Sequence, residues 1–210
     1  GTRSMLDTLR AFNHEFLNKL HVILGYLQTG EIDQAKQFII NSNLVSSQSI
    51  RETADSIRVS RICALVIGKM MHAAELGIRL TLTHDSSCIE SELLLLQDSV
   101  ITIIGNVLEN AIEELNSSVN SNQELKEITL GIYCRPDCNI ITCEDTGNGI
   151  PQELLNHIFD KGISSKGENR GTGLYLIKQI TEDYQGEISI DTEMGEGTCF
   201  TLTFTRKENL

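Results

Sequence analysis

The chain has 210 residues, of which 40% are hydrophobic and 22% are charged, proportions typical of a globular protein and unlike those of a disordered one. Its 29 acidic and 17 basic residues give a formal net charge of −12, so its surface repels polyphosphate backbones and we expect no nucleic-acid partner. This length is enough for one ordinary domain and a small additional module.

The first segment, to about residue 30, carries apolar residues at heptad spacing. This spacing predicts a coiled-coil-like helix that packs against partners along its length. The seam consists of Leu6, Leu9, Asn13, Phe16, Leu20, Ile23 and Leu27. Gly30 ends the pattern, and a second helical stretch is expected over residues 31–56. A hairpin of roughly 55 residues is too small for its own core, so residues 1–56 are predicted to pair with a second copy as a four-helix bundle in a homodimer.

From about residue 57 the pattern changes to helices interleaved with short alternating strands. In chain order, the expected elements are a helix over 62–76, a strand over 78–83, a helix over 93–117, strands over 128–134 and 139–144, a helix over 174–184, and strands over 187–192 and 198–205. Helices and mainly antiparallel strands that segregate in this way predict a two-layer α/β sandwich over residues 57–210. The fold class of the whole chain is therefore expected to be α+β.

The long predicted helix carries two asparagines, Asn106 and Asn110, four residues apart. Residues at this spacing share one helix face, so both carboxamides can point into one pocket. A carboxamide oxygen is a hard ligand that suits Mg²⁺, an ion that keeps waters and phosphate oxygens at its other positions. Taken alone, such a pair is more often a polar stripe on an exposed helix.

A second motif, Asp145-Thr146-Gly147-Asn148-Gly149, follows a predicted strand. A carboxylate at this place can accept a hydrogen bond from an exocyclic amine such as adenine N6, and the glycines let the backbone approach a flat ring. Taken alone, the motif also fits a simple Asn-Gly turn. An aspartic protease would need a second carboxylate or a dimer built around this loop, and would have Ser or Thr where Asn148 stands.

A glycine-rich run over residues 162–173 leads into the helix that starts near Leu174. Backbone of this kind at a helix N-terminus can hold a phosphate group, and Lys166 and Arg170 add cations in an otherwise acidic chain. The run lacks the Gly-Lys-Ser/Thr sequence of a Walker loop. Taken alone, it also fits a flexible surface loop.

Taken together and in this order, these motifs resemble the nucleotide-binding domain shared by histidine kinases, Hsp90-type chaperones, type II topoisomerases and MutL proteins. The resemblance covers about residues 57–208 and implies that ATP and Mg²⁺ bind, with Asn110 on the metal, Asp145 on adenine and residues 160–172 as a mobile lid. The implied nucleotide site comprises Asn106, Asn110, Asp145, Gly147, Gly149, Phe159, Lys166, Arg170, Gly171, Thr172, Gly173, Leu174 and Thr198.

One position separates the branches of this superfamily. Its ATPases carry a water-activating Glu four residues before the metal-binding Asn, whereas this chain has Asn106, which cannot take up a proton at neutral pH. The resemblance therefore favours transfer of the phosphoryl group to a protein acceptor over hydrolysis by a stand-alone ATPase, although Glu109 lies nearby.

The expected acceptor is His14 on the first helix, followed by Glu15 and by Asn18 one turn later. On the heptad, His14 and Asn18 lie away from the seam, where both ATP and a second protein can reach the imidazole. Glu15 can accept the proton of one ring nitrogen and thereby orient the other as nucleophile. Asn18 can orient a water that attacks the aspartyl phosphate of the next protein and so dephosphorylates it.

Residues 14–25 and 158–166 resemble the citrate and C4-dicarboxylate subfamily of bacterial sensor histidine kinases. This resemblance implies autophosphorylation of His14, transfer to an aspartate of a response regulator, and a cytoplasmic location for this portion of a protein anchored in the bacterial inner membrane. Membrane contact is expected only through segments outside this chain, because no apolar run here approaches the roughly 18 residues of a membrane helix. The alternative is a non-enzymatic phosphotransfer protein with a degenerate ATP domain.

Overall fold

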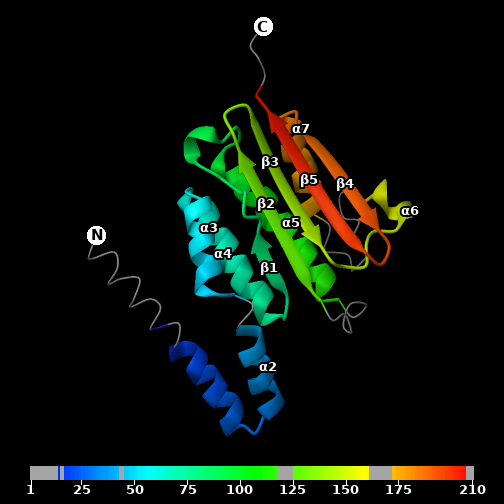
Figure 1. Cartoon of the computed structure of the whole chain (residues 1–210). Coiled ribbons are helices and arrows are strands. Elements are labelled where there is room, and N and C mark those ends of the chain that lie inside the picture. Colours follow the sequence, from blue (N-terminus) through cyan, green and yellow to red (C-terminus); the bar gives the residue numbers. More distant parts are fainter. Residues whose placement is uncertain (1–13, 15–16, 43–44, 118–124, 161–171, 207–210) are drawn as a thin grey trace, which may run out of the picture. The chain divides into compact units, whose positions relative to one another are not determined.

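The structure is a computed structural model that describes residues 14, 17–42, 45–117, 125–160 and 172–206. The chain divides into two compact units, Gly1–Asn43 and Leu44–Leu210. The first unit is helical, and the second contains the sheet (Figure 1). The expected α+β class with an N-terminal helical part is thereby confirmed.

The first unit is a helical hairpin built from residues 17–28 and α2 (Ile32–Ser42). The first helix ends at Gly30, whose φ of +78° is the left-handed conformation that glycine adopts readily. The two helices contact each other through the rings of Tyr26 and Phe38, whose centroids lie 6.3 Å apart, and Ala35 of α2 is buried. Several large apolar side chains of this unit remain exposed, namely Leu17, Leu20, Val22, Leu24, Leu27, Ile32 and Ile39.

The expected single helical stretch over residues 31–56 is wrong, because it consists of two helices, α2 and α3 (Ser47–Ser56). Ser46 starts α3 as its N-cap, since its Oγ accepts a hydrogen bond from the Ser49 N–H at 3.0 Å. The buried Thr53 of α3 contacts Met70 of the following helix, so α3 packs within the second unit. The boundary between the units therefore precedes α3, whereas the sequence placed it after residue 56.

The second unit is a five-stranded sheet covered by helices. Its elements after α3 are α4 (Ser60–Glu75), β1 (Arg79–Leu82), a short 3-10 helix (Glu90–Glu92), α5 (Gln97–Leu115), β2 (Glu127–Cys134), β3 (Cys138–Asp145), α6 (Gln152–Leu155), α7 (Gly173–Asp183), β4 (Glu187–Glu193) and β5 (Gly197–Thr205). The strand order is β1-β2-β3-β5-β4. Only the β1–β2 pair is parallel, and the other three pairs are antiparallel.

Helices α4, α5 and α7 lie on one face of the sheet, with α5 between the other two (Figure 1). Helix α5 takes this central place because its apolar residues are buried against the sheet and the neighbouring helices. These residues are Val100, Ile103, Ile104, Val107, Leu108, Ala111, Ile112 and Leu115. Full burial of one such Leu or Ile contributes about 1.5–3 kcal/mol, so α5 is held along its length and presents its polar flank in a defined orientation.

The pairing of β3 with β5 determines where the second motif lies. Asp145, the last residue of β3, stands opposite Thr198 near the start of β5. The loop after β3 and the turn that connects β4 with β5 therefore meet at one end of the sheet. The glycines at 147 and 149 and those at 195 and 197, about 50 residues apart in the sequence, are neighbours there.

Candidate nucleotide site

Asn106 lies on the flank of α5 that faces the start of α7. Its Nδ2 donates a hydrogen bond of 2.8 Å to the Thr102 carbonyl oxygen, which turns Oδ1 away from its own helix backbone. A Cβ added at Gly173, the first residue of α7, would lie 2.5 Å from Asn106 Oδ1. A larger residue at position 173 would therefore have to displace the Asn106 carboxamide.

Asn110, one turn further along α5, carries a buried amide nitrogen that has no hydrogen-bond partner among the described residues. A buried amide group without a partner destabilises a fold by about 1–3 kcal/mol, and nearly all such groups are satisfied in native proteins. Rotation of the carboxamide by 180° would place its oxygen at the same point. The position thus suits a ligand that supplies either an acceptor, such as a phosphate oxygen, or a metal ion for the amide oxygen.

Asp145 is 6% exposed, and its Oδ1 accepts a hydrogen bond of 2.8 Å from the Gly147 N–H. Burial raises the pKa of Asp145 to about 6, the backbone N–H groups of Gly147 and Thr198 oppose this rise, and the Glu114 carboxylate adds to it. The group is therefore largely a buried anion at neutral pH, and a carboxylate oxygen can accept a further hydrogen bond. An exocyclic amine can donate it.

The loop after β3 is anchored on both sides. A Cβ at Gly147 would lie 2.7 Å from both Asp145 Oδ1 and Glu114 Cγ. Gly149 has a φ of +81° and lies against the backbone of Glu193, so a larger residue is excluded there by both conformation and space.

Hydrogen bonds connect this loop to the β4–β5 hairpin. The Ile150 N–H donates to Thr192 Oγ1 at 2.9 Å, and Gly195 N–H donates to the Asn148 carbonyl at 2.8 Å. Thr192 Oγ1 also lies 2.9 Å from Thr198 Oγ1. Thr192 was not predicted as part of the site, because it belongs to no motif. Glu114 was not predicted either, although it lies four residues after Asn110 and therefore on the same helix face.

Two of the remaining nucleotide-site predictions, Thr172 and Leu174, lie at the start of α7. Thr172 is exposed and Leu174 half-buried, and the first N–H groups of such a helix lack intrahelical acceptors. Phe159 is half-buried in the turn that follows α6. Lys166, Arg170 and Gly171 lie outside the described residues, so their positions remain predictions.

His14 lies in a helical conformation in the first unit and is exposed, as is Asn18. Glu15 lies outside the described residues. Two of the three predicted phosphotransfer residues are therefore exposed in a single copy, as are the seam residues Leu20 and Leu27, and the phosphotransfer role stays a prediction.

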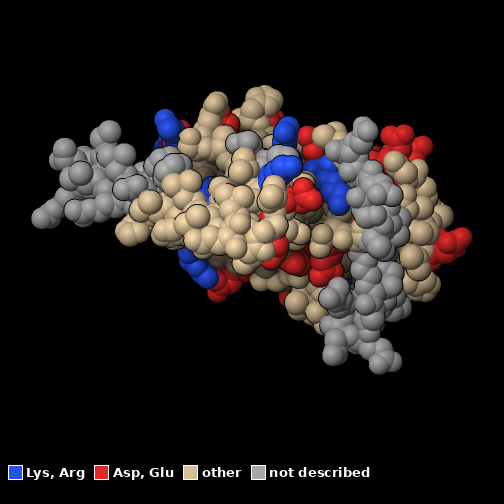
Figure 2. Space-filling view, turned by 90° about the horizontal axis from the view of Figure 1, so that it is seen from below, with Lys and Arg blue, Asp and Glu red and all other residues tan. Residues whose placement is uncertain are grey.

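The described charged side chains, acidic and basic, are interspersed with uncharged ones on the face seen in Figure 2. Within the described residues, no group of three or more His, Cys, Asp or Glu gathers in a metal-binding arrangement. None of the described helices combines the length and the apolar character that a bilayer span requires.

The described part of the second unit therefore brings together three features. These are a buried acceptor for an amine at Asp145, the carboxamide of Asn110 with its buried, unpartnered nitrogen, and a glycine-led helix N-terminus that can bind a phosphate. Such a set suits a purine nucleotide accompanied by a hard cation.

Comparison with known proteins gives matches over both units. The family described as "Histidine kinase-, DNA gyrase B-, and HSP90-like ATPase" matches residues 96–208. The family described as "Sensor_kinase_SpoOB-type, alpha-helical domain" matches residues 2–52. The Asn106/Asn110 pair, the Asp145 loop and the glycine-rich run all lie within the first of these matches.

Curated relatives align with almost the entire chain. Sensor protein CitS of Halalkalibacterium halodurans is 35% identical over 99% of this chain and 38% of its own length. Sensor histidine kinase DcuS of Escherichia coli K12 is 34% identical over 95% of this chain and 36% of its own length. A probable C4-dicarboxylate sensor kinase of Bacillus subtilis is 32% identical over 99% of this chain. The chain spans little more than a third of the length of these relatives.

Solved structures share the fold at low sequence identity. Full-length ShkA in complex with AMPPNP superposes on 68% of this chain and 28% of its own, with a TM-score of 0.53 and 18% identity. The catalytic domain of histidine kinase ThkA superposes on 68% of this chain and 92% of its own, with a TM-score of 0.52 and 18% identity. At this identity the likeness bears on the fold, and it confirms the α/β sandwich predicted for the second unit.

Proposed function

Since the chain belongs to the family of histidine kinase-, DNA gyrase B- and HSP90-like ATPases, we propose that it phosphorylates itself on His14 with ATP. It would then pass the phosphoryl group to an aspartate of a response regulator. Its relation to the CitS and DcuS sensor kinases over nearly its whole length supports this proposal. The observation that carries this proposal is the pairing of a nucleotide-type site with an exposed histidine on a separate helical unit. The site presents buried Asp145 and the partnerless amide of Asn110, while His14 lies open to solvent.

In this proposal Asp145 accepts the adenine amine, and the glycines at 147 and 149 let the loop pack closely against Glu114 and Glu193 beside it. Asn110 is the metal ligand, because its buried amide lacks a partner and a carboxamide oxygen suits a hard cation. Mg²⁺ bound there would neutralise charge on the phosphate oxygens. The N-terminus of α7, led by Gly173, would hold the phosphates.

For the transfer itself, an imidazole nitrogen of His14 attacks the γ-phosphorus, the bond to the bridging oxygen breaks, and ADP leaves. The proton on the other ring nitrogen is held by Glu15, which orients the ring. Asn106 supports transfer over hydrolysis because its amide, fixed on the Thr102 carbonyl, cannot accept a proton from water.

We further propose that the chain acts as a homodimer through the hairpin. The seam residues Leu20 and Leu27 are 44% and 52% exposed in a single copy, and unpaired apolar stripes of this kind indicate an interaction surface. A second copy would bury them in a four-helix bundle. By analogy with the longer relatives, the chain would be the kinase core of a sensor anchored in the bacterial inner membrane. The same proposal gives Asn18 a role in dephosphorylation of the regulator.

The test is incubation with γ-labelled ATP, followed by exposure of the labelled protein to acid and to base. A phosphohistidine loses its label in acid and keeps it in base. The His14→Gln variant should lose all label and still bind ATP. His21→Gln is the matched control, because His21 is exposed on the same helix and should label normally. Label that persists in His14→Gln would refute the assignment, and a chain that binds no ATP would favour the non-enzymatic alternative.

A further inference from the structure

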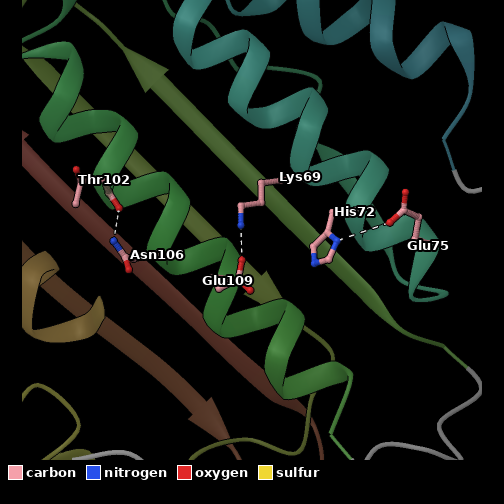
Figure 3. A network of polar contacts seen from close by, with 6 residues as sticks. All are labelled: Lys69, His72, Glu75, Thr102, Asn106 and Glu109. Atoms are coloured by element: carbon pink, nitrogen blue, oxygen red, sulfur yellow. Dashed lines mark hydrogen bonds and ion pairs between the residues drawn. The ribbon is translucent and has the colours of Figure 1, made fainter. Parts of the chain in front are cut away.

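Lys69 of α4 and Glu109 of α5 form an ion pair through Lys69 Nζ and Glu109 Oε2. The two side chains are 21% and 43% exposed, so the pair is partly shielded from solvent. Figure 3 shows the Lys69 side chain reaching from α4 to Glu109, whereas His72, three residues further along α4, turns to Glu75 of its own helix at 3.9 Å.

The ion pair fixes the direction of a carboxylate that directly precedes Asn110. Glu109 is also three residues after Asn106, so these two residues are neighbours on the surface of α5, whereas the adjacent Glu109 and Asn110 project about 100° apart. Asn106 points toward the start of α7, whereas Glu109 is drawn toward α4 (Figure 3). The next carboxylate whose contacts are described, Glu114, lies one turn beyond Asn110, against the loop of Asp145, at the end assigned to adenine.

A carboxylate beside the phosphates of a bound nucleotide can act as a general base. In that reaction a water oxygen attacks the γ-phosphorus, the bond to the bridging oxygen breaks, the proton of the water passes to the carboxylate, and ADP and phosphate leave. Hydrolysis of this kind would consume ATP without phosphorylating the protein. At position 106 this chain has an asparagine, which cannot act as such a base, but Glu109 on the same helix could.

We propose that Lys69 is a positioning residue that holds the Glu109 carboxylate on the α4 side of α5 and so suppresses hydrolysis of bound ATP. The inference rests on the proposed function, since it requires that ATP binds beside Asn106 and Asn110. The preference of the site for transfer to histidine over hydrolysis by water would then depend on two features. These are the amide at position 106 and the ion pair that restrains Glu109.

A second ion pair between the same helices provides a matched control. Arg61 of α4 and Asp98 of α5 approach to 2.7 Å, and their side chains are 61% and 79% exposed. Asp98 lies in the first turn of α5, two turns before Asn106. Loss of this pair loosens the same helix–helix contact without releasing a carboxylate beside Asn110.

The experiment measures phosphate release from ATP by the full chain in a His14→Gln background, where phosphate cannot come from phosphohistidine. Nucleotide affinity is measured in parallel by titration with ADP. In this background Lys69→Met should raise the rate of phosphate release about tenfold, a fraction of the 10²–10⁴ that a well-placed general base supplies. Lys69→Arg and Arg61→Met should leave the rate unchanged, and ADP affinity should stay within about twofold throughout.

The double variant Lys69→Met with Glu109→Gln decides whether Glu109 is responsible. A return to the unmodified rate supports the inference, because a glutamine cannot take up the proton. Equal rates in Lys69→Met and the unmodified background would overturn the inference, as would an increase that survives Glu109→Gln or appears equally in Arg61→Met. If the chain binds ADP normally in these experiments, such results leave the proposed kinase function intact. If it binds none, both proposals fail.

Discussion

Asp145 is a carboxylate that the protein buries at the expense of stability, and its replacement by Asn tests the proposed role directly. Its pKa of about 6 in the folded protein compares with an ordinary value of 3.8. Because the folded-state pKa is the higher one, the native protein binds the proton more tightly than the unfolded chain. The stabilisation that protonation gives is complete below pH 3.8 and is lost as the pH rises through about 6.

The size of the effect follows from these two pKa values. The difference of about 2 corresponds to roughly 3 kcal/mol over the full range, of which about 1.4 kcal/mol falls between pH 7.5 and pH 5. The side chain that replaces Asp145 in the Asp145→Asn variant does not titrate. The wild type should therefore gain about 1.4 kcal/mol relative to this variant when the pH is lowered from 7.5 to 5, and the variant should be the more stable protein at pH 7.5.

Urea unfolding at both pH values, at one protomer concentration, measures this difference. Nucleotide titration supplies the second reading. A hydrogen bond to a charged acceptor contributes about 1.5–3 kcal/mol, so Asp145→Asn should weaken ATP binding at pH 7.5 by roughly tenfold or more. Wild-type affinity should also fall at pH 5 relative to that of the variant, because protonated Asp145 is a poorer acceptor.

The reasoning would be refuted if the stability difference between the two proteins were the same at pH 5 and pH 7.5. That result would mean that Asp145 titrates in the folded protein as it does in water. Unchanged ATP affinity in Asp145→Asn at pH 7.5 would separately exclude Asp145 as the adenine acceptor, whatever its pKa.

Four further predictions concern the other parts of the proposal. Asn110→Asp should abolish labelling from γ-labelled ATP while its circular dichroism stays unchanged; normal labelling would exclude Asn110 as metal ligand. Gly173→Ala should lower nucleotide affinity at least tenfold, since the added Cβ meets Asn106 Oδ1 at 2.5 Å, and a titration equal to wild type would contradict that contact. Light scattering should give a dimer near twice 23.3 kDa and a monomer for Leu20→Glu, whereas a folded wild-type monomer at micromolar concentration would rule out the bundle. Asn18→Ala should keep autophosphorylation but slow the decay of the phosphorylated regulator, and identical decay with both proteins, faster than that of the regulator alone, would remove Asn18 from the phosphatase reaction.

Most of the fold was predictable because its signals are local. The apolar spacing of the long helix agrees with the buried residues of α5, and the positions of the strands agree with β1 to β5 within a few residues. The break between α2 and α3 was missed because the apolar pattern is weak there, and a serine N-cap at Ser46 decides the boundary. The short helix α6 was missed for a similar reason, since four residues are too few for periodicity to show.

The sequence by itself determined the order of the motifs, the placement of Asn106 and Asn110 on one helix face, and the positions of the glycines. Only the tertiary structure decided which distant residues complete the site. Thr192 reaches the loop of Asp145 because β4 pairs with β5, and Lys69 reaches Glu109 across 40 residues because α4 packs on α5. The burial that raises the pKa of Asp145 has the same origin. Periodicity and turn chemistry act over a few residues, whereas burial and ion pairing depend on the elements that pack against one another.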